Sequence, residues 1–132
     1  MGEMFKRLIP FQASVVIFLK DIMEQVNFIS SGTELESIIN SDDPQIVLYV
    51  IDNCPICKRH ISDMMHRYNF KFHIFDTNLH KESYKKHKTS MLFPETRVYK
   101  SGELKYLRGG QLYESQIEEL RNVLNICNGT SN

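Results

Sequence analysis

Short apolar runs alternate along this chain with segments in which apolar residues recur at helical spacing. The runs are typical of strands, and the periodic segments are typical of helices that bury one face. From residue 26 onward the pattern predicts strands over 26–30, 45–51 and 70–76, a strand hairpin over 96–108, and helices over 31–41, 55–68, 78–88 and 113–127. This alternation of strands and helices predicts an α/β fold.

The first three strands are separated by helices, whereas the last two are joined by a tight turn. A strand–helix–strand unit implies parallel pairing, and a hairpin around Ser101 and Gly102 implies antiparallel pairing. Residues 45–51 form a continuous apolar run, as expected for a central strand buried on both faces. We therefore predict one domain over residues 26–128, a mixed sheet of about five strands flanked by helices.

Residues 1–25 precede this pattern and carry an apolar segment of their own. The part from Leu8 to Leu19 is 12 residues long, shorter than the roughly 20 residues that cross a bilayer. Lys6 and Arg7 precede it as in a secretory signal, but no small-residue cleavage site follows. One helical face would hold Phe11, Val15, Phe18, Leu19, Ile22 and Val26. We predict an N-terminal helical extension, with membrane contact through this segment as an alternative.

Composition narrows the classes of function. The 132 residues are 42% hydrophobic and 24% charged, as in an ordinary globular domain. Lys and Arg number 16, as do Asp and Glu, so no basic field favours nucleic acid, and we expect none to be bound. Three cysteines, with Cys127 as the odd one, are too few for a small secreted scaffold and favour a reducing compartment, so we expect a cytoplasmic protein.

Cys54 and Cys57 lie in the stretch VLYVIDNCPICKRH, where a strand passes into a helix. Cysteines at this spacing serve as a redox couple, as half of a metal site or as a structural crosslink. Structural zinc uses four ligands, usually in two pairs, and His60 is the one further candidate nearby. Because the chain has no second pair, we predict no metal site.

Four features of the chain together resemble the thioredoxin superfamily. They are the C-x-x-C at the strand-to-helix junction, Pro94 opening a late strand in LFPETRVY, the hairpin KSGEL, and Gly109 after the last strand. The C-x-x-C alone is a weak signal, but inside a βαβ unit and followed by the proline and the hairpin it is specific. The resemblance implies a thioredoxin-like fold and a thiol–disulfide oxidoreductase that reduces protein disulfides. A redox-active Cys54–Cys57 disulfide would stand in place of a bound cofactor.

Local chemistry gives the two cysteines different roles. Cys54 precedes the helix, whose first N–H groups and positive dipole end stabilise a thiolate. Cys57 lies one turn further in and is expected to be more buried. We therefore predict that Cys54 is the attacking nucleophile and Cys57 the resolving thiol. Lys58, Arg59 and His60 are expected to add positive charge that favours the thiolate.

The resemblance also implies a substrate-binding surface beside the cysteines. It implies that the peptide bond before Pro94 is cis, and that this loop lies against the disulfide. The loop would present the backbone of Phe93 to an extended substrate chain. We predict that Pro55 and Ile56, between the cysteines, belong to the same surface. The expected partners are proteins that contain disulfides and a reductase that recycles the oxidised pair.

The chain departs from the superfamily pattern in its acids. Thioredoxins carry a buried acid six residues before the first cysteine, which assists proton transfer to the second cysteine. Here that position is Leu48. Asp52 and Glu95 are the nearest candidates to replace it, and both are expected to be solvated loop residues.

Other residues favour a likeness to glutaredoxins. Asn53 replaces the usual Trp before the first cysteine, and Pro55-Ile56 between the cysteines is an order closer to glutaredoxins. Gly109-Gly110 matches part of their glutathione site, but Glu114 replaces an Asp and Leu92-Phe93 replaces Thr-Val. Glutathione therefore stays open as an alternative source of electrons.

The remaining alternative is a thioredoxin-fold interaction module with a structural or vestigial disulfide. The missing acid and the N-terminal extension favour the module, whereas the intact cysteine pair and Pro94 favour the enzyme. Cys127 falls on the apolar side of the last helix, where a buried, inert thiol is expected. The sequence thus predicts a disulfide reductase, with the module and a glutathione-dependent reductase as alternatives.

Overall fold

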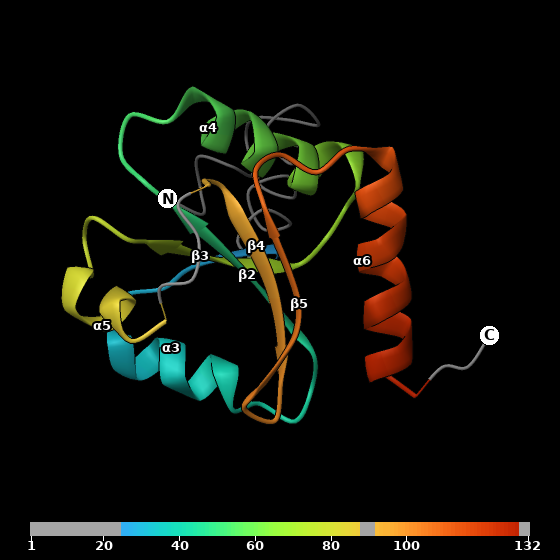
Figure 1. Cartoon of the computed structure of the whole chain (residues 1–132), viewed down its shortest axis with the longest axis horizontal. Helices are drawn as coiled ribbons and strands as arrows, with labels where there is room; N and C mark the ends of the chain where they lie inside the picture. The colour runs from blue at the N-terminus through green and yellow to red at the C-terminus, as the bar shows by residue number, and fades with distance from the viewer. Residues whose placement is uncertain (1–24, 88–91, 130–132) are drawn as a thin grey trace, which may run out of the picture.

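The computed structural model describes residues 25–87 and 92–129 (Figure 1). The predicted N-terminal helix lies almost wholly outside this part of the chain. The strands are β1 (Val26–Phe28), β2 (Gln45–Val50), β3 (Phe72–Asp76), β4 (Glu95–Lys100) and β5 (Glu103–Gly109). The helices are α3 (Gly32–Ile39), α4 (Pro55–Ser62), the π-helical turn η1 (Asp63–Arg67), α5 (Lys81–Lys85) and α6 (Glu114–Cys127).

The five strands form one mixed sheet in the order β1-β3-β2-β4-β5. β3 pairs in parallel with β1 and β2, whereas β4 pairs antiparallel with β2 and β5. Residues 46–50 of the central strand β2 are all buried, as their continuous apolar run predicts. The predicted parallel and antiparallel pairings are confirmed.

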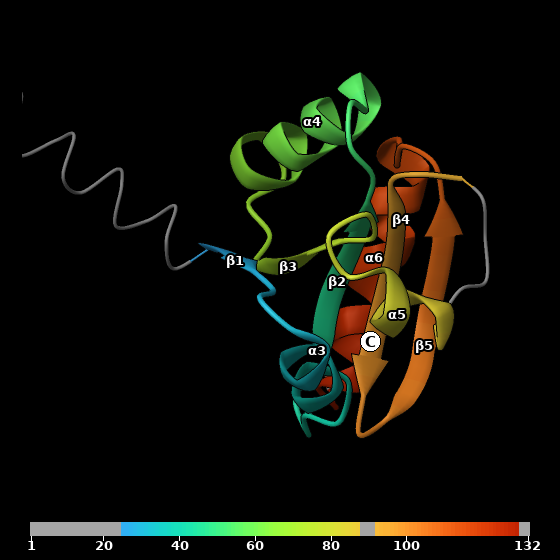
Figure 2. The ribbon, with the colours of Figure 1, turned by 90° about the vertical axis from the view of Figure 1, so that its left-hand side faces the viewer.

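Helices cover both faces of the sheet, as the two views together show (Figures 1 and 2). α4, η1 and α6 pack on one face, which we call the α4/α6 face. Its buried core consists of Val26, Ile46, Leu48, Val50, Cys57, Met64, Phe70, Phe72, Ile74, Val98, Leu112, Ile117 and Leu120. α3 and α5 cover the other, the α3/α5 face. Its core consists of Ile29, Leu35, Ile39, Val47, Tyr49, Phe75 and Tyr99.

The hairpin between β4 and β5 is fixed by its turn. Ser101 and Gly102 have φ angles of 51° and 83°, the two consecutive positive values of a type I′ turn. The turn is also anchored to the end of α3, because Gly102 N donates to Ile39 O at 2.9 Å. The predicted hairpin is therefore confirmed, with its turn at the predicted residues.

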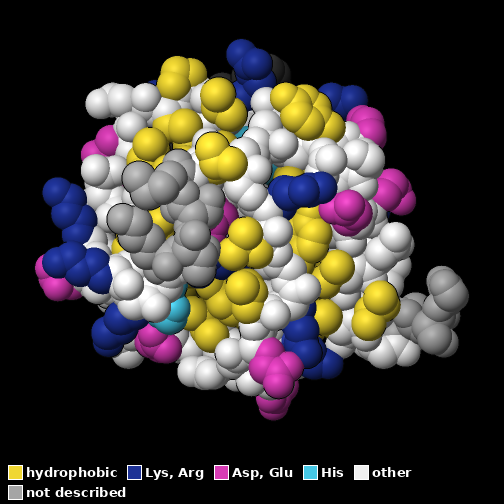
Figure 3. Space-filling model, viewed as in Figure 1, with side chains coloured by type: hydrophobic (Ala, Val, Ile, Leu, Met, Phe, Trp, Pro, Cys, Tyr) yellow, Lys and Arg dark blue, Asp and Glu magenta, His cyan; other side chains and the backbone are white. Residues whose placement is uncertain are grey.

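The surface agrees with the balanced composition. Acidic and basic side chains are interspersed on the face shown in Figure 3, with apolar side chains between them. Among the described residues, no helix has the length and apolarity that crossing a bilayer requires. The segment from Leu8 to Leu19, for which the sequence leaves membrane contact as an alternative, lies outside those residues.

Candidate functional site

Cys54 and Cys57 form a disulfide where β2 leads into α4, with their Cα atoms 5.2 Å apart. Cys54 is the N-cap of α4, and Pro55 occupies its first turn, where a missing N–H costs no hydrogen bond. The Cys57 N–H donates to Cys54 Sγ at 3.1 Å. The helix start therefore directs a backbone donor and its positive dipole end at the Cys54 sulfur.

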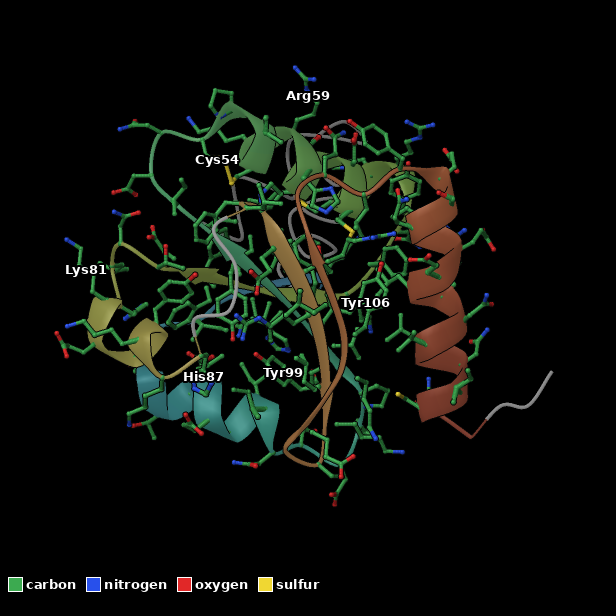
Figure 4. All side chains as sticks on the ribbon, viewed as in Figure 1. Cys54, Arg59, Lys81, His87, Tyr99 and Tyr106 are labelled. Atoms are coloured by element: carbon green, nitrogen blue, oxygen red, sulfur yellow. A yellow bond between two sulfur atoms is a disulfide. The ribbon has the colours of Figure 1, made fainter. Side chains whose placement is uncertain are left out.

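The two sulfur-bearing residues differ in accessibility. Cys54 is partly exposed, whereas Cys57 is 2% exposed and belongs to the core of the α4/α6 face. Pro55 and Ile56 between them are exposed. Figure 4 shows Cys54 at the N-terminal end of α4, and Arg59 pointing outward from the same helix. A partner in solution can reach Cys54 more readily than Cys57.

A loop at the start of β4 packs on the same core as the cysteines. The Phe93–Pro94 peptide bond is cis, the geometry that the sequence resemblance implies. Phe93 is partly buried and packs, like Cys54, against the core cluster that contains Cys57. Pro94 is buried, and its carbonyl accepts from Gly110 N at 2.8 Å. This bond ties the loop to the end of β5.

The α4/α6 face carries no carboxylate six residues before Cys54, where thioredoxins have a buried acid. Leu48 is fully buried in the same core cluster as Cys57, and it pairs across the sheet with Thr96. Asp52 is exposed, as expected. The expectation for Glu95 is wrong, because its side chain is 0% exposed. Successive residues of a strand point to opposite faces, so Glu95 lies on the other side of β4 from Thr96.

Glu95 belongs to a buried polar network on the α3/α5 face. The Arg97 guanidinium, 2% exposed, forms a salt bridge with Glu95 and donates to Tyr99 Oη at 2.8 Å and to the His87 carbonyl. Arg97 also lies over the Tyr49 ring, 4.3 Å from its centroid, and the two tyrosine hydroxyls are 2.8 Å apart. Burial, with Tyr99 alongside, raises the pKa of Tyr49. Glu95 is therefore held by a structural ion pair.

His60 lies on the inner side of α4, one turn after Cys57, and is 0% exposed. Neither ring nitrogen has a hydrogen-bond partner within the described part of the chain. Burial lowers the pKa of His60 to about 4, against a smaller opposing effect of Asp63. The prediction that His60 adds positive charge is therefore wrong, because a buried imidazole of this pKa is neutral near pH 7. Lys58 and Arg59 are exposed.

An apolar pocket of about 300 Å³ opens beside the disulfide. Its lining is Phe28, Ile29, Val50, Ile51, Asp52, Asn53, Cys54, Cys57, Lys58, Ile61, Ile74, Asp76 and Leu79. Phe28 and Leu79 on this lining are 70% and 72% exposed, unusually high values for large apolar side chains. The pocket cannot be predicted from the sequence, because its walls come from segments far apart in the chain.

The residues that match part of a glutathione site lie in the loop before β4 and between β5 and the start of α6. Gly109 ends β5, and Gly110 has a φ of 86°. The Glu114 carboxylate, which replaces the expected Asp, accepts from Arg67 at 2.7 Å. Leu92 is exposed and Phe93 partly buried. The position that would supply an acid for glutathione is thus engaged in a surface ion pair.

The described residues include one free cysteine, Cys127, in addition to the disulfide. Among residues 25–87 and 92–129, no group of three or more His, Cys, Asp and Glu side chains is placed to hold a metal ion. Cys127 is a buried free thiol at the end of α6, as its spacing predicts. It lies outside the Cys54–Cys57 disulfide and at the opposite end of the helix from the loop that follows β5.

The chain is similar to known proteins in structure, but it matches none of the family models or curated sequences. Solved structures do match, among them a thioredoxin from Trypanosoma brucei brucei with a TM-score of 0.65 and 18% identity over 77% of this chain and 93% of that one. Thioredoxin F from spinach chloroplast matches with a TM-score of 0.62 and 16% identity, over 77% and 96%. Plasmodium falciparum thioredoxin matches with a TM-score of 0.59 and 23% identity, over 73% and 96%.

At these identities the likeness establishes the fold. The chain has the thioredoxin fold, and its disulfide occupies the strand-to-helix junction where the C-x-x-C was predicted. The thioredoxin-like fold that the sequence motifs indicated is therefore confirmed.

Proposed function

We propose that this protein is a thiol–disulfide oxidoreductase that reduces disulfides in other proteins through Cys54 and Cys57. The observation that carries the proposal is the disulfide at the start of α4, with one partly exposed and one buried cysteine. An accessible thiolate and a nearby second thiol are what thiol–disulfide exchange requires.

In the reduced protein, the Cys54 thiolate attacks one sulfur of a substrate disulfide. A bond forms between Cys54 Sγ and that sulfur, and the other substrate sulfur leaves as a thiolate. Cys57 then loses its proton and attacks Cys54 Sγ, which releases the second substrate thiolate and leaves the Cys54–Cys57 disulfide. The substrate gains two electrons and the protein loses two. The Cys57 N–H and the helix dipole stabilise the Cys54 anion that starts the sequence.

The substrate proposed is an extended protein segment that contains a disulfide. The exposed Pro55 and Ile56 would contact it on one side of Cys54, and the backbone of Phe93 beside Pro94 on the other. The apolar pocket next to Cys54 is suited to a large apolar side chain near the substrate cysteine. A reductase or glutathione would then recycle the oxidised pair, which fits a cytoplasmic location.

The first test is reduction of insulin disulfides with dithiothreitol as the electron donor. We expect the wild-type protein to accelerate the reaction, and Cys54→Ser to reduce the rate to background because the nucleophile is lost. Cys127→Ser is the matched control, because it removes a buried thiol outside the disulfide, and it should retain full activity. Equal activity in wild type and Cys54→Ser would contradict the proposal.

The reduction potential of the pair gives the direction of electron flow. We expect equilibration in glutathione buffers to yield a reversible two-electron couple below about −230 mV, in the range of cytosolic reductases. A value above about −180 mV would instead indicate an oxidant or isomerase. If no reversible couple is found, the disulfide does not take part in redox exchange.

A non-catalytic interaction module is the second candidate, and fully buried Leu48 is the observation that favours it. Without a carboxylate at that position, proton transfer from Cys57 needs another acceptor. A module would bind its partner equally well as wild type and as Cys54→Ser/Cys57→Ser, and it would be inactive with insulin. The insulin assay therefore separates the two candidates directly.

A further inference from the structure

His60 combines three properties that are unusual for a polar side chain in a core. It is 0% exposed, neither ring nitrogen has a hydrogen-bond partner among the described residues, and it is ionisable. Buried polar groups in proteins are hydrogen-bonded in the great majority of cases, since leaving one unpaired costs about 1–3 kcal/mol. An unpaired imidazole retained in the core therefore calls for a functional reason.

Its place in α4 puts it beside the buried cysteine. Cys57 and His60 are three residues apart, and both are buried on the inner side of the helix. Side chains at this spacing are neighbours on a helix, with about 5–6 Å between their Cβ atoms. The residues of β2 packed in the same cluster as Cys57 are Ile46, Leu48 and Val50, and none of them can accept or give a proton.

We propose that His60 is the proton acceptor for Cys57 in the step that resolves the mixed disulfide. The inference rests on the oxidoreductase function proposed above. In the mixed disulfide, the Cys57 Sγ–H bond breaks and its proton passes to a lone pair of the neutral His60 imidazole. The sulfur's electron pair forms the bond to Cys54 Sγ, the Cys54–substrate S–S bond breaks, and the substrate sulfur leaves as a thiolate. The imidazolium then returns the proton to that thiolate or to solvent.

Burial prepares His60 for this role. With a pKa of about 4 it is neutral at pH 7, so one ring nitrogen has a lone pair free to accept a proton. When Cys57 ionises, the thiolate and the imidazolium stabilise each other at short range in a low-dielectric interior. Proton transfer and nucleophilic attack are therefore favoured together.

Asp63 and two tyrosines are further ionisable residues near His60 and this core. Asp63, on the next turn, raises the pKa of His60 but less than burial lowers it. Tyr68 and Tyr106 are partly buried and pack against this core. Their hydroxyls donate to the carboxylates of Glu114 and Glu119, so they are poor acceptors for a thiol proton.

Ellman's reagent, a symmetrical aromatic disulfide, tests the two chemical steps separately in the full chain. In a Cys127→Ser background, attack by Cys54 releases one coloured thiolate at a rate that depends on reagent concentration. Attack by Cys57 then releases a second thiolate at a rate that does not. We expect His60→Leu to leave the first phase unchanged, to slow the second at least about tenfold at pH 7, and to shift its pH profile upward.

Two matched variants keep the test decisive. His66→Leu replaces an exposed histidine of the following turn η1 and should leave both phases unchanged. His60→Gln retains a buried polar side chain that cannot take a proton, and it should slow the second phase as His60→Leu does. A normal second phase in either folded His60 variant would overturn the inference, because the imidazole would then have only a packing or hydrogen-bonding role. Loss of the first phase in the parent protein would instead contradict the oxidoreductase function itself.

Discussion

The two faces of the sheet differ in the hydrogen bonding of their buried polar side chains. On the α3/α5 face, Glu95, Arg97 and Tyr99 follow one another at alternate positions of β4 and bond to one another. On the α4/α6 face, His60 and Thr96 are buried without a hydrogen-bond partner among the residues described. The disulfide lies on this second face.

The difference indicates which face is built for stability and which for chemistry. A connected network makes each member depend on the others, so it fixes one packing of the core. Buried polar groups without a hydrogen bond destabilise the folded state, because the water that they lost on burial is not replaced by another partner. Such a cost is tolerated where a group must remain free to exchange a proton, and His60 beside Cys57 is such a place.

Among the variants that test this difference between the faces, Arg97→Met should lower the free energy of unfolding most. The change removes one partner of the buried Arg97–Glu95 ion pair, which typically costs about 3–5 kcal/mol. We expect the free energy of unfolding, measured by urea denaturation, to fall by about that amount. The folded fraction should keep both phases of the Ellman reaction, because the network lies on the other face of the sheet.

The double variant Glu95→Gln/Arg97→Met is the control for Arg97→Met. Removing both charges should recover much of the lost stability, because no unpaired charge remains. If the double variant is as unstable as Arg97→Met, the stability is lost because the guanidinium no longer packs in the core, and not because of the Glu95 charge.

The next largest effect should be the pH dependence that His60 gives to stability. In the unfolded chain a histidine takes up its proton near pH 6.5, whereas folded His60 does so only at about 4. Between these values the unfolded state binds more protons, so the free energy of unfolding falls as the pH falls. The difference between the two pKa values corresponds to about 3 kcal/mol.

The measurement compares wild type with His60→Leu by urea denaturation between pH 7 and pH 4. The stability lost by wild type across this range should exceed that lost by His60→Leu, by up to about 3 kcal/mol. His66→Leu, which replaces an exposed histidine of η1, is the matched control for the loss of one histidine. Parallel pH profiles for wild type and His60→Leu would show that the folded and unfolded states protonate His60 alike.

Much of this molecule could be predicted from sequence because its signals are local. Residues 45–51 are apolar without interruption, so a central strand was expected. The turn at Ser101-Gly102 was expected because it sits between two strand-like runs, and Gly accepts the positive φ that the turn needs. The disulfide followed from two cysteines at the point where strand periodicity changes to helical periodicity.

Two features could not be predicted from the sequence, because each is a polar residue that is buried although residues of its type are usually exposed. The sequence predicts a solvated Glu95, since carboxylates are rarely buried, but Arg97 two positions on lies on the same side of the strand and pairs with it. The basic residues before His60 favour an exposed side chain. Its spacing from the buried Cys57 and Met64 instead places it on the inner side of the helix.

Two variants that each lack one buried hydroxyl group, Tyr99→Phe and Thr96→Val, compare the two faces of the sheet most directly. On the α3/α5 face, Tyr99→Phe removes a hydroxyl that is bonded to Tyr49 Oη and accepts from Arg97, both at 2.8 Å. We expect it to lower the free energy of unfolding by about 1–3 kcal/mol, because both buried partners lose a hydrogen bond. Urea denaturation measures this, and an unchanged midpoint would show that the network does not stabilise the fold.

Thr96→Val should have the smallest effect and the opposite sign. The Thr96 hydroxyl is buried and bonded to nothing in the described part of the structure, so its replacement by a methyl group removes a desolvation cost without breaking a hydrogen bond. We expect the free energy of unfolding to rise by about 1 kcal/mol, measured as for Tyr99→Phe, with both phases of the Ellman reaction unchanged. Because Thr96 lies opposite Leu48 on β2, a slower second phase would instead show that this hydroxyl shares the proton transfer assigned to His60. The unpaired groups of the α4/α6 face would then act together, and His60 would not be the sole acceptor.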